Sequence, residues 1–126
     1  MAFEANQKPI PGLVANADLS THQFKFVDVN SSGKVILNVT AGAAVLGVLQ
    51  DKPDAADKVA TVVGTGGGQV SKVKAGATVA SGALVMSDTA GLAITATGTN
   101  TAMGKALVGG AANELITVAL CCYGIR

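Results

Sequence analysis

The residues that could do chemistry in this chain are few. His22 is the single histidine, and it follows Ser20 and Thr21. Nothing around it resembles the strained turn that presents a serine nucleophile. Catalysis needs a base, a nucleophile or a metal held by several convergent polar groups. We therefore expect a surface or interface histidine, no catalytic residue and no enzyme activity.

The two cysteines, Cys121 and Cys122, are adjacent. Neighbouring cysteines cannot pair with each other without severe strain, and a strand would point them to opposite faces. Free cysteine packs as a small hydrophobe, so we expect reduced, buried thiols. One histidine and two adjacent cysteines do not provide the spacing of a tetrahedral metal site. We expect no metal and no cofactor.

Two further segments have the residue types of ligand-binding loops. Asp51, Asp54 and Asp57 are three apart, whereas an EF-hand calcium loop needs ligands at alternate positions, a glycine and a distal glutamate. The glycine run Gly64–Gly68 lacks the Gly-Lys-Ser/Thr ending of a phosphate-binding loop, and Gln69 follows it. We interpret both segments as ordinary loops.

Charge and composition exclude several kinds of partner. The formal net charge is +1 and aromatic residues make up 3% of the chain. A chain with so weak an electrostatic field and so few aromatic side chains to stack on bases is not expected to bind nucleic acid. No run approaches the ~18 apolar residues of a membrane span, and the N-terminus lacks the apolar region of a signal peptide. We expect no membrane partner and synthesis in a cytoplasm-like compartment.

The residues between Val70 and Leu92 predict the type of element that builds the chain. Their β-branched side chains recur at short intervals and glycines interrupt them, which favours short strands and tight turns over a helix. Asp88-Thr-Ala-Gly91 combines a polar turn opener with a glycine that can adopt positive φ. This stretch therefore predicts a β-hairpin.

The same pattern extends over the rest of the chain. In Gln23–Val29, Phe24 and Phe26 alternate with Lys25, and Asn30–Gly33 then turns the chain into Lys34–Val39. Further apolar runs follow, and we expect about eight to ten short strands with turns every eight to twelve residues. The predicted fold class is all-β, a small single-domain barrel or sandwich of short strands.

We divide the chain of 126 residues into an extended N-terminal arm, 1–16, and a single β-domain, 17–126. Because Pro9 and Pro11 prevent a regular ladder of hydrogen bonds, we expect the arm to be extended and unable to fold back as a strand of its own sheet. We expect it to be disordered in the free protein and ordered on binding a partner. Its proline and apolar residues are the predicted binding anchors. They are Phe3, Pro9, Ile10, Pro11, Leu13 and Val14.

The hydrophobic residues make up 49% of the chain but include few large side chains, so we expect a thin core. Apolar surface buried between subunits would add to the stability of such a core. We expect a homo-oligomer. The last predicted strand, Leu115–Tyr123, is apolar on both faces and is expected in the interior or at a subunit contact. The residues assigned to that core or contact are Leu115, Ile116, Val118 and Leu120.

Taken together and in order, several segments resemble the small cement, or head decoration, proteins of tailed bacteriophages. They are Ala17–Ser20 with Gln23–Val27, Gly47–Gln50 with Lys52-Pro53, Lys72–Ala77, Gly82–Val85 with Asp88–Gly91, Gly104–Leu107, and Glu114–Leu120. One departure is visible: such sequences often carry a glycine after the proline-containing loop, where this chain has Asp57.

The resemblance implies a β-tulip-like decoration fold and a homotrimer on the outer surface of an icosahedral capsid. There it would bind the major capsid protein and bridge neighbouring subunits, after synthesis in the host bacterial cytoplasm. The arm would be the capsid-binding segment. The alternative is a ligand- or carbohydrate-binding β-module of a phage tail or adhesion protein, although such sites usually contain aromatic platforms.

Overall fold

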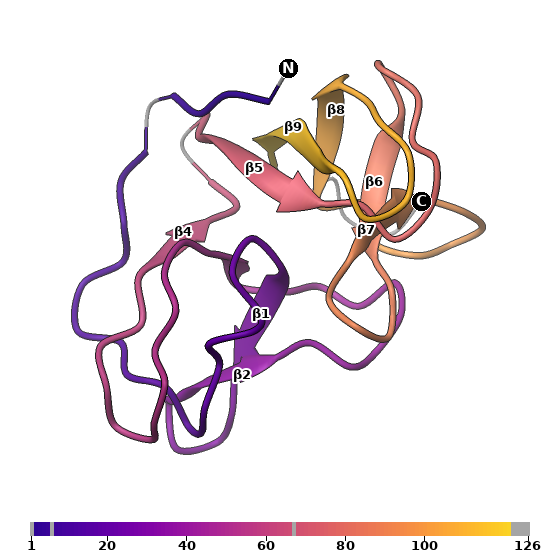
Figure 1. Cartoon of the computed structure of the whole chain (residues 1–126). Coiled ribbons are helices and arrows are strands. Elements are labelled where there is room, and N and C mark those ends of the chain that lie inside the picture. The colour runs from indigo at the N-terminus through magenta and orange to yellow at the C-terminus, as the bar shows by residue number, and fades with distance from the viewer. Residues whose placement is uncertain (1, 6, 67, 122–126) are drawn as a thin grey trace.

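The computed structural model describes residues 2–5, 7–66 and 68–121, and this part of the chain is all-β, without a helix. Its nine strands are β1 (Phe26–Val29), β2 (Val35–Leu37), β3 (Gly47–Leu49), β4 (Val62–Gly64), β5 (Val70–Lys74), β6 (Leu84–Ser87), β7 (Ala93–Thr95), β8 (Gly104–Val108) and β9 (Leu115–Leu120). They form two antiparallel sheets, ordered β2-β1-β3-β4 and β5-β9-β8-β6-β7 (Figure 1).

The predicted all-β class is confirmed, and the architecture is a small sandwich. Within the described residues neither sheet closes into a barrel. The last predicted strand reaches Leu120, and its expected continuation over 122–123 lies outside the described residues. No described segment forms a helix capable of crossing a membrane.

Both hairpins predicted from turn residues are present. Between β6 and β7, the Asp88 carboxylate Oδ1 accepts hydrogen bonds from Ala90 N (2.8 Å) and Leu92 N (2.9 Å), and Gly91 has a φ of 73°. Between β1 and β2, Asn30 accepts a hydrogen bond from Lys34 N in the same way. In each turn a short polar side chain accepts hydrogen bonds from the turn's own N–H groups, and this stabilises the reversal of the chain.

Strand alternation divides the apolar side chains of the four-stranded sheet between two clusters. Phe26, Val48 and Val63 face the five-stranded sheet and share a buried cluster with its inward residues. Their chain neighbours on the opposite face, including Val27 and Leu49, form a second cluster with Ala15 and Leu19. The four-stranded sheet is therefore buried on both faces, on one of them by residues at the end of the arm and just after it.

Phe24 departs from the predicted alternation. Its φ of 63° is left-handed, an unusual conformation for an aromatic residue, and it lies two residues before the start of β1. Its N–H donates to Leu49 O (2.7 Å) in the four-stranded sheet, while its carbonyl accepts from Lys74 N (2.8 Å) in the other sheet. Phe24 thus joins the two sheets through its backbone.

The arm runs along the molecule and is hydrogen-bonded to three strands at sheet edges (Figure 1). Ala5 exchanges hydrogen bonds with Val70 on β5, at 3.1 and 2.9 Å. Ile10 N donates to Val62 O on β4 (2.9 Å), and Val35 N on β2 donates to Val14 O (2.9 Å). Of the four outermost strands in the two sheets, three, β2, β4 and β5, thus form backbone hydrogen bonds with described residues of the arm.

As expected, the described residues of the arm form no strand of either sheet, but they do not stand free of the domain, since they are hydrogen-bonded to its sheet edges. Proline removes a donor only at its own position, so Pro9 and Pro11 leave Ile10 N between them free to donate. The pairing occurs as isolated bridges, among them one between Pro9 and Val63 and one between Val14 and Val59. An arm can follow an edge in this way without forming a continuous strand.

Candidate interaction surface

Three large apolar side chains are exposed around Thr117 on the outer face of the five-stranded sheet. Leu115, two residues earlier on β9, is 42% exposed and faces the same side as Thr117. The ladder is irregular between Ala106 and Val108, opposite Thr117, and leaves Leu107 44% exposed. Phe3 N donates to Thr117 Oγ1 (2.8 Å), and its ring is 45% exposed.

Lysines border these apolar residues. Lys74 is directly opposite Leu115, Lys72 is opposite Thr117, and Lys105 on β8 is opposite Ala119 of β9. Directly opposed residues point to the same face of a sheet, so the three ammonium groups belong to this outer face. We call this surface the outer patch. Its members are Phe3, Leu107, Leu115, Lys72, Lys74 and Lys105.

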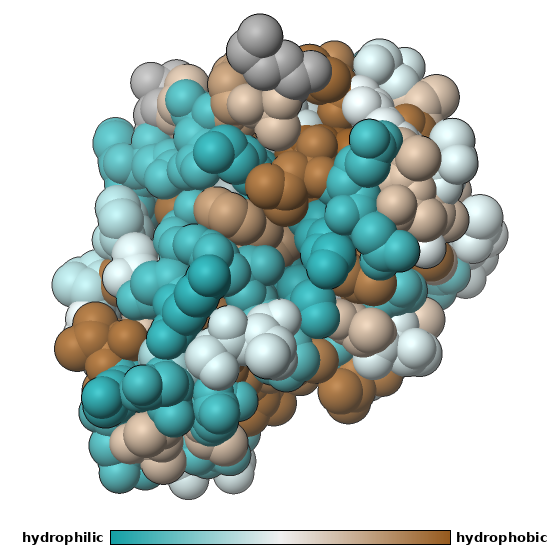
Figure 2. All heavy atoms as spheres, viewed as in Figure 1, coloured by the Kyte–Doolittle hydropathy of each residue, from teal (hydrophilic) through white to brown (hydrophobic). Residues whose placement is uncertain are grey.

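Acidic side chains are scarce at the outer patch. None of β5, β8 and β9 contains aspartate or glutamate. One carboxylate reaches the patch from the arm, where Glu4 Oε1 is 3.6 Å from Lys72 Nζ. The Lys72 ammonium is also 5.7 Å from the centre of the Phe24 ring, a cation–π distance. Figure 2 shows hydrophobic surface between hydrophilic regions in the part of the view occupied by β5 and β9 in Figure 1.

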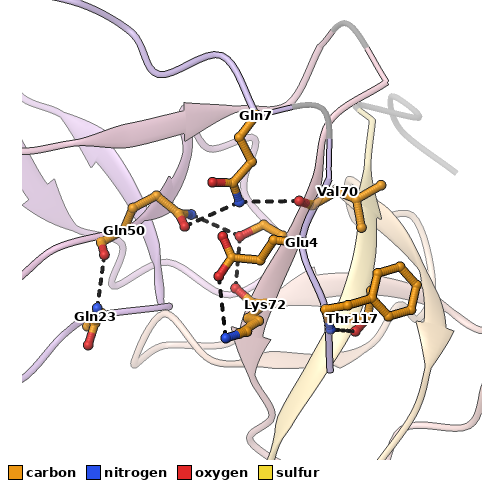
Figure 3. Close-up of polar contacts among 9 residues, drawn as sticks. Glu4, Gln7, Gln23, Gln50, Val70, Lys72 and Thr117 are labelled. Atoms are coloured by element: carbon orange, nitrogen blue, oxygen red, sulfur yellow. Dashed lines mark hydrogen bonds and ion pairs between the residues drawn. The ribbon is translucent and has the colours of Figure 1, made fainter. Parts of the chain in front are cut away.

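A cluster of neutral amides holds the arm against both sheets (Figure 3). Gln50, just after β3, donates from Nε2 to Ser71 Oγ on β5 (2.9 Å). Gln7 of the arm donates to Gln50 Oε1 (3.4 Å) and to Val70 O (3.3 Å). Gln23 Nε2 donates to Gln50 O (2.9 Å). Residues 3–5 continue over the five-stranded sheet, where the hydrogen bonds of Ala5 with Val70 and of Phe3 N with Thr117 Oγ1 place Phe3 in the outer patch.

The predicted arm anchors divide into two groups. Phe3, Pro9 and Pro11 are exposed, whereas Ile10, Leu13 and Val14 are half-buried. Ile10 lies over Gly64, where an added Cβ would be 3.3 Å from Ile10 Cδ1. Leu13 packs against the second core cluster. Some of the apolar side chains predicted as anchors for a partner therefore contact the arm's own domain.

The four residues assigned to a core or subunit contact also divide. Ile116 and Val118 are fully buried and Leu120 is 2% exposed, all in the cluster between the sheets. Leu115 faces the other way and joins Phe3 in the outer patch. The sequence reasoning missed Leu107 and the three lysines. The alternation of Lys72-Val73-Lys74 indicated an exposed face, but nothing in the sequence paired that face with β9.

The side chains whose types could support catalysis or metal binding do not gather into one site in the described part of the chain. His22 Nδ1 is 3.3 Å from Lys25 Nζ. Partial burial, and then the Lys25 ammonium, lower the pKa of His22 below 6.5, while Asp18 acts in the opposite direction. The described residues contain no cluster of three histidine, cysteine or acidic residues that could hold a metal, and no pocket.

The remaining sequence-predicted residues occupy surface positions. Asp54 pairs with Lys58 (3.0 Å) and Asp57 with Lys34 (2.6 Å) at the surface. Cys121 is exposed, so the expectation of a buried thiol is wrong there, because β9 ends one residue earlier. Cys122 and Tyr123 lie outside the described residues.

Comparison of the sequence with protein-family models and with curated proteins finds no match to either.

Proposed function

We propose that the protein is a structural virion protein that decorates the outer surface of an icosahedral phage capsid. It would stabilise the shell by bridging neighbouring subunits of the major capsid protein. The observation that carries the proposal is the ordered series of segments, from Ala17–Ser20 to Glu114–Leu120, that resembles head decoration proteins. Several of these segments are strands or turns of the two-sheet domain, such as the Asp88–Gly91 turn and β9.

The departure at Asp57 fits the proposal. Glycine is common at this place in the sequences that the chain resembles, and Asp57 has a φ of 66°, a conformation that glycine adopts without strain. Aspartate tolerates this region better than most residues. The loop thus has, at position 57, the positive φ that glycine adopts without strain.

The surface also supports a contact function. Phe3, Leu107 and Leu115 expose apolar area in one place, and apolar residues gathered on a surface are typical of interaction sites. A protein that binds only the assembled shell stabilises that state by mass action, and many copies on one shell act together.

The carbohydrate-binding alternative has less support. Its aromatic platform would have to come from four residues, of which Phe26 is fully buried and Phe24 lies beneath the Lys72 ammonium. Phe3 is exposed but belongs to the outer patch. Tyr123 lies outside the described residues.

The proposal is tested with shells of the phage that encodes this chain, isolated without it. Purified protein should co-sediment with these shells up to a fixed number of copies per capsid subunit. It should also raise the temperature at which the shells break down. Shells that melt at the same temperature with and without the protein would exclude the cement role.

A second experiment tests the arm as the capsid-binding segment. Deleting residues 2–12 removes none of the fully buried members of the two main core clusters, so the domain should remain folded. Binding to shells should fall by orders of magnitude. As a matched variant, a triple substitution of the exposed arm residues, Phe3→Ser, Pro9→Ala and Pro11→Ala, keeps the buried contacts of Ile10 and Leu13. Undiminished binding by the deletion would reject this role.

A further inference from the structure

The outer patch concentrates apolar exposure at one place in the molecule. Of the five large hydrophobic side chains that are exposed in the described residues, three belong to it. The other two, Val39 and Val59, lie in loops of the first half of the chain. Leu107 and Leu115 both lie within hydrogen-bonded strands, Leu107 at the irregularity of the β8–β9 ladder and Leu115 opposite Lys74 of β5. A partner would therefore meet a preformed apolar surface at little cost in chain ordering.

The charge of this surface indicates the chemistry of that partner. Lys72, Lys74 and Lys105 border the exposed leucines, and among the described residues Glu4 is the one acidic side chain paired with them. Two copies meeting through this face about a two-fold axis would bring six lysines together, and such juxtaposed like charges are costly. A partner whose surface carries carboxylates would complement the positive charge of the outer patch.

The apolar side chains favour a protein over a nucleic acid. Phosphate groups would reach the lysines but would leave Leu107 and Leu115 without a partner. A protein surface with an apolar centre and acidic residues around it satisfies both components. The chain's formal net charge of +1 provides little attraction for a polyanion beyond the patch itself.

We infer that the outer patch docks on a protein surface in which aspartate and glutamate surround an apolar centre. On the proposed function, on which this inference rests, that surface is on the exterior of the assembled shell. The outer patch is then a second contact beside the arm. Phe3 links the two, because the arm places it over Thr117.

The test uses the same shells and two charge reversals of equal size. The double variant Lys74→Glu/Lys105→Glu changes the outer patch, and Lys52→Glu/Lys58→Glu changes an exposed loop of the first half of the chain by the same four charges. We expect the patch variant to bind shells at least tenfold more weakly. The affinity of the loop variant for shells should stay within about threefold of that of the parent protein. Raising the salt concentration should lower the affinity of the parent protein toward that of the patch variant.

A second pair of variants tests the apolar component. Leu107→Ser and Leu115→Ser alter exposed side chains, so both proteins should fold with unchanged thermal unfolding yet bind shells more weakly. Equal binding by the patch and loop charge variants would overturn the inference while leaving the decoration role intact. If the parent protein itself fails to bind shells, the proposed function fails instead.

Two further outcomes would assign the patch to another occupant and overturn the inference. If Leu115→Ser converts an oligomer into monomers in sedimentation, the patch is a contact between copies of this chain. If the parent protein binds double-stranded DNA as tightly as it binds shells, and Lys74→Glu/Lys105→Glu removes that binding, the partner is a nucleic acid.

Discussion

His22 is the side chain in the described residues whose ordinary pKa, 6.5, lies nearest to neutral pH. Its imidazole is half-buried beside Lys25, so partial burial and then the lysine charge lower its pKa in the folded protein. Asp18 is near enough to raise it in part. Protonation of His22 is therefore harder in the folded chain than in the unfolded one.

This lowered pKa predicts a loss of stability on mild acidification. As the pH falls through 6.5, the unfolded chain takes up the proton before the folded chain does, so the free energy of unfolding decreases. Above 6.5 the contribution of His22 is fully present. Urea unfolding of the parent protein and of His22→Gln between about pH 5 and 8 should show a smaller pH dependence for the variant. Identical slopes would contradict the assignment.

Asp57 provides a second prediction at the residue scale. Its φ of 66° costs a residue with a Cβ about 1–2 kcal/mol, although aspartate bears this better than alanine. The ion pair with Lys34 is at the surface and worth no more than about 1 kcal/mol. Asp57→Gly should therefore be neutral or stabilising, and Asp57→Ala should be destabilising by about 1 kcal/mol. Urea unfolding that ranks alanine above glycine would contradict this.

At the scale of elements, the features set by local sequence were predictable. The Asp88–Gly91 turn follows from a carboxylate that accepts two nearby N–H groups and a glycine at positive φ. The pairing of β9 with β5 could not be predicted, because it joins segments distant in the sequence, whereas β8 and β9 are consecutive strands. The outer patch was missed for the same reason, since it exists only once that register is known.

The arm shows a different limit of sequence reasoning. Counting prolines identified an extended segment but not its docking, because the pairing uses the residues between and around the prolines. Phe24 is a further case. Its alternation with Lys25 predicted an extended strand residue. In the structure Phe24 instead adopts a left-handed backbone conformation, in which it is hydrogen-bonded to both sheets.

β9 offers a matched pair of substitutions. Leu120→Asp places an unpaired carboxylate in the cluster between the sheets, where the native side chain is 2% exposed, and should cost several kcal/mol, roughly 3 or more. Leu115→Asp makes the same change on the outer face of the same strand, where the side chain is 42% exposed, and should cost less than about 1 kcal/mol. Chemical denaturation of both variants measures the difference, and a fully stable Leu120→Asp protein would show that the strand is misplaced.

At the scale of the whole molecule, the core is built from small side chains. Phe26 is the one aromatic residue among its fully buried members in the described part of the chain, and most of the others are valine or alanine. Such a core buries less apolar area per residue, at about 25 cal/mol for each Å². Contacts between subunits would add to it.

We therefore predict that the protein associates with itself in solution, and its resemblance to head decoration proteins implies that the oligomer is a homotrimer. Sedimentation equilibrium at micromolar concentration should return a mass of about three times the 12.4 kDa chain. The apparent melting temperature should also rise with protein concentration, because association stabilises the folded state by mass action. A monomer with a concentration-independent transition would contradict the prediction.

The position of β9 determines when the molecule can fold. It is the last strand in the chain order of the described residues, yet it is hydrogen-bonded to both β5 and β8. Until residues 115–120 have been synthesised, β5 lacks its neighbour in the sheet, and the Thr117 hydroxyl that holds Phe3 does not yet exist. Phe3 must thus wait for a residue that is synthesised 114 positions later. A nascent chain stalled before β9 should be degraded rapidly by protease and become resistant once β9 is free to pair.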